Sequence, residues 1–189
     1  MTAQGAAKQA PGQLRHAGDG LTVLADLPSR SQLLTRLANA LNRGQIQTEI
    51  RPAQQTTALA WEKLTANAAI NPLTALFETP NGALLDDPAL KELMIGAARE
   101  TAVVAAAQGI TLSFDDPMDY VLEVASRTAT NHSSMWQDIR RGAATEIEAI
   151  TGAVIAAGRR CQTPTPLNVQ LYELICAKMA GERLTHTQL

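Results

Sequence analysis

From Thr56 onward the chain consists of long alanine-rich stretches in which apolar residues recur at helical spacing, with proline or glycine at their ends. Two stretches open on Asp-Pro, at Asp87-Pro88 and Asp116-Pro117, which provides an N-cap side chain and a proline at the first helical position. Pro80-Asn81-Gly82 predicts a turn. Helices are therefore predicted over residues 57–77 with a kink at Pro72, 88–108, 117–128, 134–141, 145–157 and from Pro166.

The first part of the chain, up to a boundary near residue 55, has a different pattern. Residues 13–25 alternate loosely around Gly18-Asp19-Gly20, which predicts two short strands paired as a hairpin. Ser29 is the predicted N-cap of an amphipathic helix that ends at Gly44, and one more strand is predicted between Ile46 and Pro52. The predicted fold class is mainly α, with a small α/β segment over residues 1–55 and a helical domain over residues 56–189. The polar tail after Gly181 is expected to fray.

Gly18 and Gly20 could also suggest a dinucleotide-binding loop. Such a loop needs a third glycine at a fixed offset and a helix that opens directly after it, because the helix N-terminus holds the phosphates. Neither feature follows Gly20. The sequence therefore assigns no cofactor-binding residues.

Composition excludes several classes of protein. The chain has 189 residues, 46% of them hydrophobic and 18% charged, with a formal net charge of -2, which is typical of a globular protein. No apolar run could span a bilayer and residues 1–11 lack a signal-peptide core, so we expect a cytoplasmic protein without a membrane partner. Cys161 and Cys176 fit no disulfide or metal spacing, and no metal site is predicted. The charges form no basic patch with interleaved aromatics, so nucleic acid is not an expected partner.

A polar stripe marks the first long helix. Lys63, Asn67 and Asn71 are four residues apart, so they share one face of an otherwise apolar helix. Such a stripe is either a solvated face or the lining of a cavity. Asparagine is a poor interior helix former, which weakens the solvated-face interpretation slightly.

A second polar segment covers residues 131–152. Ser133 or Ser134 is a predicted helix cap, and Thr145 with Glu148 has the spacing of a capping box. Capping leaves Glu146 unassigned, and an acidic residue in a first helical turn usually only complements the helix dipole. Physical chemistry alone thus predicts a helical domain with one suggestive polar stripe.

Taken together, these segments resemble the ketopantoate reductase (2-dehydropantoate 2-reductase) family. The blocks that carry the resemblance occur in the family's order over residues 56–180: Lys63-Leu-x-x-Asn67-x-x-Ile-Asn71-Pro-Leu-Thr-Ala-Leu, Asn81-Gly82, Ser133-Ser134-Met-x-Gln-Asp138, Thr145-Glu146-Ile-x-x-Ile-x-Gly152, and Thr163-Pro164 with Asn168. The resemblance implies a helical substrate domain of the 6-phosphogluconate dehydrogenase C-terminal-like type. It also implies that residues 1–55 are the last strands and one helix of a Rossmann domain.

The resemblance further implies NADPH-dependent reduction of 2-dehydropantoate to pantoate, a step toward pantothenate and coenzyme A. Lys63 matches the family's general acid, and Glu146 matches its acidic substrate-binding residue. Asn67, Asn71 and Ser134 match substrate-contacting positions, and Asn81 and Asn131 are weaker matches. At Glu148 and Thr151 an aspartate and an asparagine are more usual in the family.

The glycine-rich loop and the first βαβ units of the family have no counterpart in this sequence. We therefore expect NADPH to serve the complete enzyme, weak NADPH binding by this chain, and inactivity of the chain on its own. A non-enzymatic helical interaction module, formed as a homodimer through exposed strand edges, is one alternative. Reduction of another 2-oxo acid is a second alternative, because small pocket changes alter selectivity by modest energies.

Overall fold

The computed structural model describes residues 1–181, apart from the side chains of residues 7, 8 and 17. The chain divides into two compact units, Met1–Ala60 and the part from Trp61 onward. The assignment of residues 1–55 and 56–189 to two functional domains stays a prediction. The tail after Gly181, which was expected to fray, lies outside the described residues.

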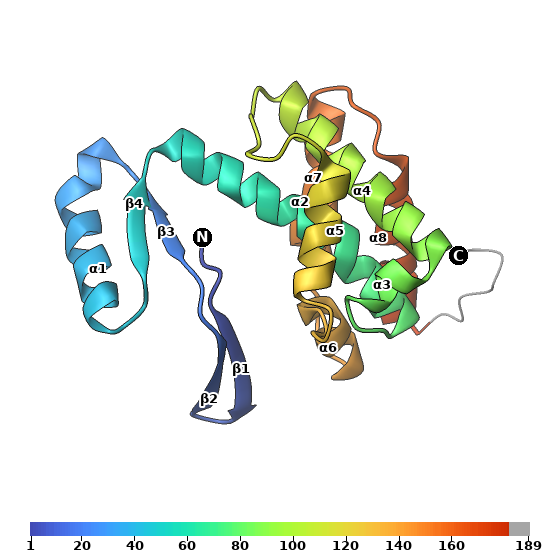
Figure 1. The fold of residues 1–189 in the computed structure, drawn as a ribbon, viewed down its shortest axis with the longest axis horizontal. Helices are drawn as coiled ribbons and strands as arrows, with labels where there is room; N and C mark the ends of the chain where they lie inside the picture. Colours follow the sequence, from blue (N-terminus) through green and yellow to red (C-terminus); the bar gives the residue numbers. More distant parts are fainter. Residues whose placement is uncertain (182–189) are drawn as a thin grey trace. The chain divides into compact units, whose positions relative to one another are not determined.

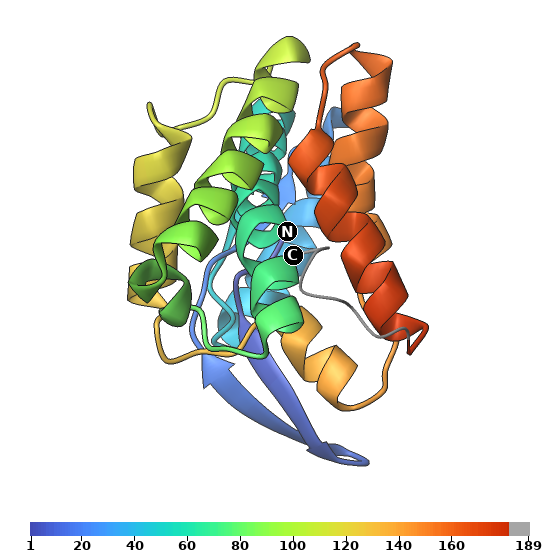
Figure 2. The ribbon, with the colours of Figure 1, turned by 90° about the vertical axis from the view of Figure 1, so that its right-hand side faces the viewer.

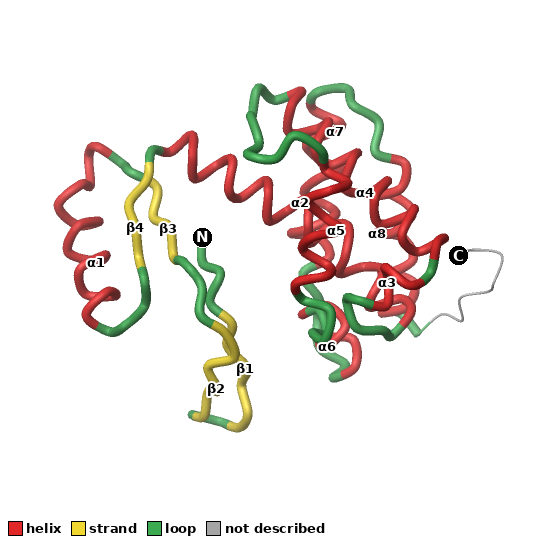
Figure 3. The backbone as a smooth tube through the Cα atoms, viewed as in Figure 1, coloured by secondary structure: helices red, strands yellow, loops and turns green. Residues whose placement is uncertain are grey.

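The first unit contains two strand pairs, one complete α-helix and the start of helix α2 (Ala53–Phe77) (Figure 3). Strands β1 (Gly5–Ala10) and β2 (Gln13–Gly18) pair in antiparallel fashion. Strands β3 (Thr22–Ala25) and β4 (Thr48–Arg51) pair in parallel, and the connection between them runs through the 3-10 turn η1 (Pro28–Arg30) and helix α1 (Ser31–Arg43). Together β3, α1 and β4 make one βαβ unit.

The predicted hairpin within residues 13–25 is wrong in its pairing. Both strands exist, but β2 pairs with β1 through a turn at Pro11-Gly12, and β3 pairs with the distant β4. Gly12 has φ of 75°, and proline followed by a left-handed glycine suits a type II turn. Parallel pairing joins strands far apart in sequence, so local alternation could not reveal it. Ser29 is also not the helix cap, because it lies within η1 and α1 begins at Ser31 without a side-chain cap.

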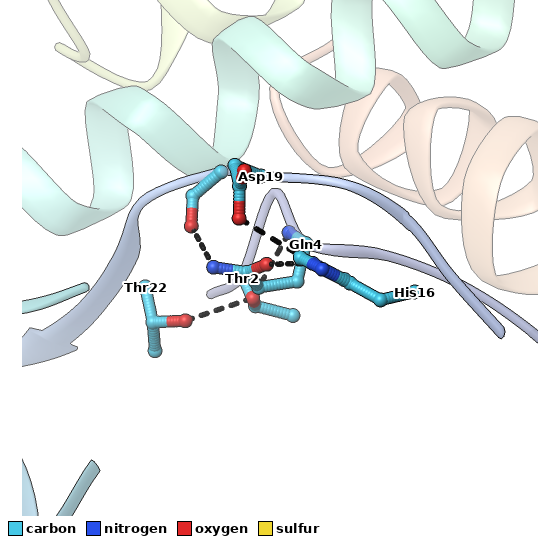
Figure 4. A network of polar contacts seen from close by, with 6 residues as sticks. Thr2, Gln4, His16, Asp19 and Thr22 are labelled. Carbon is cyan, nitrogen blue, oxygen red and sulfur yellow. Dashed lines mark hydrogen bonds and ion pairs between the residues drawn. The ribbon is translucent and has the colours of Figure 1, made fainter. Parts of the chain in front are cut away.

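A polar network holds the Gly18-Asp19-Gly20 segment against the N-terminal residues (Figure 4). His16 Nε2 lies 2.8 Å from Gln4 Oε1 and 3.6 Å from an Asp19 carboxylate oxygen, and the Gln4 amide donates to the Gly20 carbonyl. A Cβ at position 20 would overlap the Ala3 carbonyl. Glycine is therefore required at position 20 because another backbone segment approaches it closely.

The second unit is helical, as predicted, and Figures 1 and 2 show its helices side by side. Helix α4 packs against α5, α7 and α8, and Figure 2 shows α5 and α8 on opposite sides of α2. The predicted helix over residues 145–157 is instead a π-helical turn followed by a short α-helix that extends to Arg160. The elements are α2 (Ala53–Phe77), α3 (Ala83–Asp86), α4 (Pro88–Ala107), α5 (Pro117–Arg127), α6 (Ser134–Arg140), η2 (Glu148–Gly152), α7 (Ala153–Arg160) and α8 (Pro166–Met179).

Helix α2 is buried on nearly every side from Thr65 to Leu76. A helix that is apolar all round belongs in a core, and its alanines allow neighbouring helices to approach closely. Its residues form one cluster with buried side chains from α4, α5, α6, α7 and α8. The core includes Ala68, Ala69, Leu73, Met94, Ala97, Val104, Val121, Met135, Val154 and Ile175.

The predicted Asp-Pro helix starts are confirmed. Asp87 accepts hydrogen bonds from the backbone N–H groups of Ala89 and Leu90 at 2.8 and 3.2 Å. Asp116 accepts one from Met118 at 2.8 Å. Each carboxylate satisfies N–H groups that have no partner within their own helix.

Helix α8 has no side-chain cap of its own, and a carboxylate from α4 takes that role. The two oxygens of Glu100 accept from the backbone N–H groups of Leu167 and Asn168 at 2.8 and 2.9 Å. The Asn168 side-chain amide donates to the same carboxylate at 2.8 Å, and Asn168 is fully buried. Glu100 therefore joins α4 to α8 and complements the α8 dipole.

Replacing Glu100 with alanine should lower the free energy of unfolding by about 2–4 kcal/mol, because two backbone donors lose their acceptor and the buried Asn168 amide keeps only the Ala97 carbonyl. Urea denaturation of the full chain measures this loss. Glu92→Ala, at an exposed position of the same helix, is the matched control and should change stability by less than about 0.5 kcal/mol. Equal losses in the two variants would contradict the role given to Glu100.

Candidate functional site

The polar stripe on α2 passes from the surface into the core. Lys63 is exposed, Asn67 is half-buried, and Asn71 is only 7% exposed. A purely solvated stripe is therefore excluded at Asn71, which lies among core residues. Asn67 and Asn71 carry uncharged polar groups that could orient a small polar ligand.

The residue next to Lys63 anchors this part of α2. Glu62 is 8% exposed, and its carboxylate accepts from the backbone N–H of Ser113 at 2.8 Å. The Tyr120 hydroxyl donates to the Glu62 carbonyl at 3.1 Å. Burial and the nearby Glu62 carboxylate raise the pKa of Tyr120. These contacts fix the rotation of α2 at Lys63, whose own side chain stays accessible.

A buried hydroxyl pair joins α2 to the start of α6. Thr74 Oγ1 lies 2.8 Å from Ser133 Oγ, and both residues are buried. Ser133 also caps α6 by accepting from the Trp136 N–H at 3.1 Å, which confirms a predicted cap. Ser134, the exposed first residue of α6, directly follows this connection. The structure thus links the segment that carries Asn71 to the segment that carries Ser134.

The structure also brings Asn81 and Asn131 together. The Asn81 N–H donates to the Asn131 carbonyl at 2.9 Å, and the Asn81 side-chain amide donates to Thr128 Oγ1 at 2.9 Å. A Cβ at Gly82 would lie 2.6 Å from the Ala129 Cβ, so the turn needs glycine there. Asn81 is buried and clamps the turn after α2 to the end of α5, whereas Asn131 is exposed. Direct contact of either residue with a substrate stays a prediction.

Glu146 is exposed and lies just before η2. The capping box predicted for Thr145 and Glu148 is wrong. Thr145 Oγ1 accepts from the Ile147 N–H at 3.3 Å, and the Glu148 carboxylate accepts from the Tyr172 hydroxyl of α8 at 2.5 Å. The hydrogen bond to Glu148 is the main cause that raises the pKa of Tyr172 to about 12. The bond crosses between elements far apart in sequence, and no local signal in the sequence could have found Tyr172.

Residues of the second unit line several cavities. One of them, of about 690 Å³, is lined by α4 together with Met118 and Leu167. Another, of about 340 Å³, lies between Ala75, Glu78, Trp136 and Arg140. Neither of these two cavities is lined by Lys63 or Glu146, and a pocket that joins those two residues stays a prediction.

Two further observations bear on the chemistry. Over residues 1–181, no group of three His, Cys, Asp or Glu side chains is arranged to hold a metal ion, and Cys161 and Cys176 are free thiols. In the same range no helix has the length and apolar character needed to cross a membrane.

The family model described as "Ketopantoate reductase PanE/ApbA C terminal" matches residues 55–179. The curated 2-dehydropantoate 2-reductase of Halobacterium salinarum is 35% identical over 92% of this chain and 57% of its own length. That of Pyrococcus horikoshii is 31% identical over 94% of this chain and 58% of its own. This chain therefore spans less than two thirds of the length of these relatives.

Comparison with solved structures finds the same fold in other reductases and dehydrogenases. The PanE/ApbA family ketopantoate reductase of Ralstonia eutropha JMP134 superposes with a TM-score of 0.85 at 26% identity, covering 96% of this chain and 58% of that one. D-mandelate dehydrogenase in complex with NADH reaches 0.86 at 23% identity, covering 96% and 62%, a likeness of fold alone. The family match and the superposition thus place the helical unit in the class of helical C-terminal domains found in reductases. More specifically, the chain belongs to the ketopantoate reductase PanE/ApbA C-terminal family.

The Thr74–Ser133 contact can be tested by removing one hydroxyl at constant shape. Thr74→Val should lower the free energy of unfolding by about 1–3 kcal/mol, because Ser133 loses a buried partner. Thr101→Val is the matched control: Thr101 is equally buried, but its hydroxyl donates only to Ala97 of the same helix, at 2.9 Å. In a double-mutant cycle with Ser133→Ala, Thr74→Val should show coupling of about 1 kcal/mol and Thr101→Val none. Absence of coupling at Thr74 would contradict the connection.

Proposed function

We propose that this chain supplies the substrate-side residues of an enzyme that reduces 2-dehydropantoate to pantoate with NADPH. The observation that carries the proposal is the stripe Lys63, Asn67 and Asn71 on α2, which enters the core within the segment matched by the ketopantoate reductase family. A stripe of this kind suits a site that is open to solvent at its amine end and desolvated at its amide end.

In the proposed reaction, negative charge develops on the C2 oxygen of the ketone as its carbon is reduced. Lys63 donates the proton that this oxygen needs, a role suited to an ammonium group held at the edge of a buried helix. Glu146 accepts a hydrogen bond from the substrate hydroxyl. Asn67, Asn71 and Ser134 orient the carboxylate and hydroxyl groups without adding a second strong charge.

Residues 1–55 are proposed to be the closing part of a dinucleotide-binding domain. The β3–α1–β4 arrangement is the repeating unit of such domains. Leu27, Leu33 and Leu37 are 46%, 59% and 43% exposed, which is consistent with a sheet wider than these two strands. The turn between β3 and α1 contains no glycine, and Pro28 has no N–H to offer a phosphate. This part of the chain therefore does not by itself fit the pyrophosphate of NADPH.

A small 2-oxo or 2-hydroxy acid is thus the proposed partner, and a homodimer is the proposed assembly. A ketopantoate reductase from Staphylococcus aureus with the same fold is described as dimeric. A cytoplasmic location remains the expectation stated from the sequence.

Isothermal titration of the full chain with pantoate tests the substrate-side proposal. Lys63→Ala and Glu146→Gln should each weaken binding by about ten-fold or more, because a charge-assisted hydrogen bond to the ligand is lost. Lys91→Ala and Glu92→Gln, which remove the same charges from α4, are the matched controls and should leave affinity within about two-fold. Binding that is indifferent to Lys63 and Glu146 would instead favour the non-enzymatic helical module.

A separate titration addresses the cofactor. NADPH should bind this chain far more weakly than it binds a full-length relative such as the Pyrococcus horikoshii reductase, because residues 1–60 lack a phosphate cradle. NADPH fluorescence, measured for both proteins under the same conditions, gives the comparison. Equal affinities would show that the cofactor is held by residues other than those of the family's glycine-rich loop.

A further inference from the structure

The segment that carries Glu146 continues into an unusual turn. Residues Glu148–Gly152 form the π-helical turn η2, which is wider than an α-helical turn. π-Turns of this kind are rare, and they often occur at functional sites. Because the Glu146 side chain is exposed, the backbone of residues 145–148 determines where its carboxylate can reach.

Two side-chain contacts with α8 hold this segment, one on each side of Glu146. Before it, the Thr145 hydroxyl lies 3.2 Å from the Met179 sulfur. After it, the Tyr172 hydroxyl donates to the Glu148 carboxylate at 2.5 Å. Residues 172 and 179 are about two helical turns apart, so α8 supports the segment at two separated points.

The local packing favours a defined position for Glu148. A Cβ at Gly152 would lie 3.1 Å from the Glu148 carboxyl group, so glycine leaves room for that group. On the inner side of the turn, Ile150 is 6% exposed and Thr151 is fully buried, which anchors the backbone to the core. The Tyr172 bond adds a polar contact between the outer side of η2 and α8.

We propose that Tyr172 is a positioning residue for Glu146, and that it acts by holding Glu148 and η2 against α8. This inference rests on the proposed function, in which Glu146 binds a substrate hydroxyl. Tyr172 itself makes no contact with the substrate. It limits the motion of the backbone that carries Glu146, so that less conformational freedom is lost when the ligand binds.

Tyr172→Phe removes only the hydroxyl and is the central variant. The pantoate dissociation constant of the full chain should rise about five-fold, because more conformational freedom of the segment that carries Glu146 is then lost on binding. Amide hydrogen exchange should accelerate in residues 146–152 and stay unchanged in α4. In combination with Glu146→Gln, Tyr172→Phe should cause no further loss of affinity, because it acts through Glu146.

Two comparisons separate positioning from a general loss of structure. Tyr120→Phe removes the chain's other tyrosine hydroxyl, whose acceptor is Glu62 on α2, so its effect should add to that of Glu146→Gln. Glu148→Gln keeps an acceptor for Tyr172 and should bind pantoate nearly as well as the parent chain. Glu148→Ala should resemble Tyr172→Phe both in affinity and in amide exchange.

The outcomes are distinguishable. Unchanged exchange in residues 146–152 of Tyr172→Phe, or losses that simply add to those of Glu146→Gln, would overturn the inference. If Glu146→Gln itself leaves pantoate affinity unchanged, the proposed function fails, and the exchange measurement still decides whether Tyr172 holds the segment.

Discussion

Burial of α2 is the constraint on which the rest of the second unit depends. Between Thr65 and Leu76 almost every side chain of this helix is inaccessible, so neighbouring helices must pack closely around it and its polar groups need partners inside the protein. Alanines meet the first requirement. The Thr74–Ser133 hydroxyl pair meets part of the second, and it also sets where α6 begins.

Polar contacts between distant residues also hold the helix ends and the segments that join the helices. Asn81 clamps the turn after α2 to the end of α5, Glu100 caps α8 from a neighbouring helix, and Tyr172 holds the turn that follows Glu146. Each contact pairs a polar side chain with a partner distant in sequence. The candidate site residues on loops and helix ends are therefore supported by hydrogen bonds to packed helices, which is how irregular segments acquire a defined position.

Some helix starts could be predicted from the sequence because their causes are local. Asp87 and Asp116 cap helices through N–H groups two or three residues away, so the Asp-Pro pattern is sufficient. The hairpin and capping-box predictions failed because β3 and Glu148 pair with partners farther away in the sequence than the patterns assumed. Strand β3 pairs with the distant strand β4, and the Tyr172 hydroxyl donates a hydrogen bond to the Glu148 carboxylate. For Lys63 and Glu146, spacing alone left their roles open, and the family resemblance supplied the hypothesis.

By itself, the amino-acid sequence determined the helical class, most helix starts and ends, and membership of a reductase family, because periodicity, capping and motif order depend on neighbours along the chain. Only the tertiary structure decided that the stripe on α2 runs from an exposed amine to a buried amide. It also decided which side chains connect Asn81, Ser133 and Glu148 to the core. Burial and long-range hydrogen bonds depend on which surfaces meet in space, and that information is absent from any single stretch of sequence.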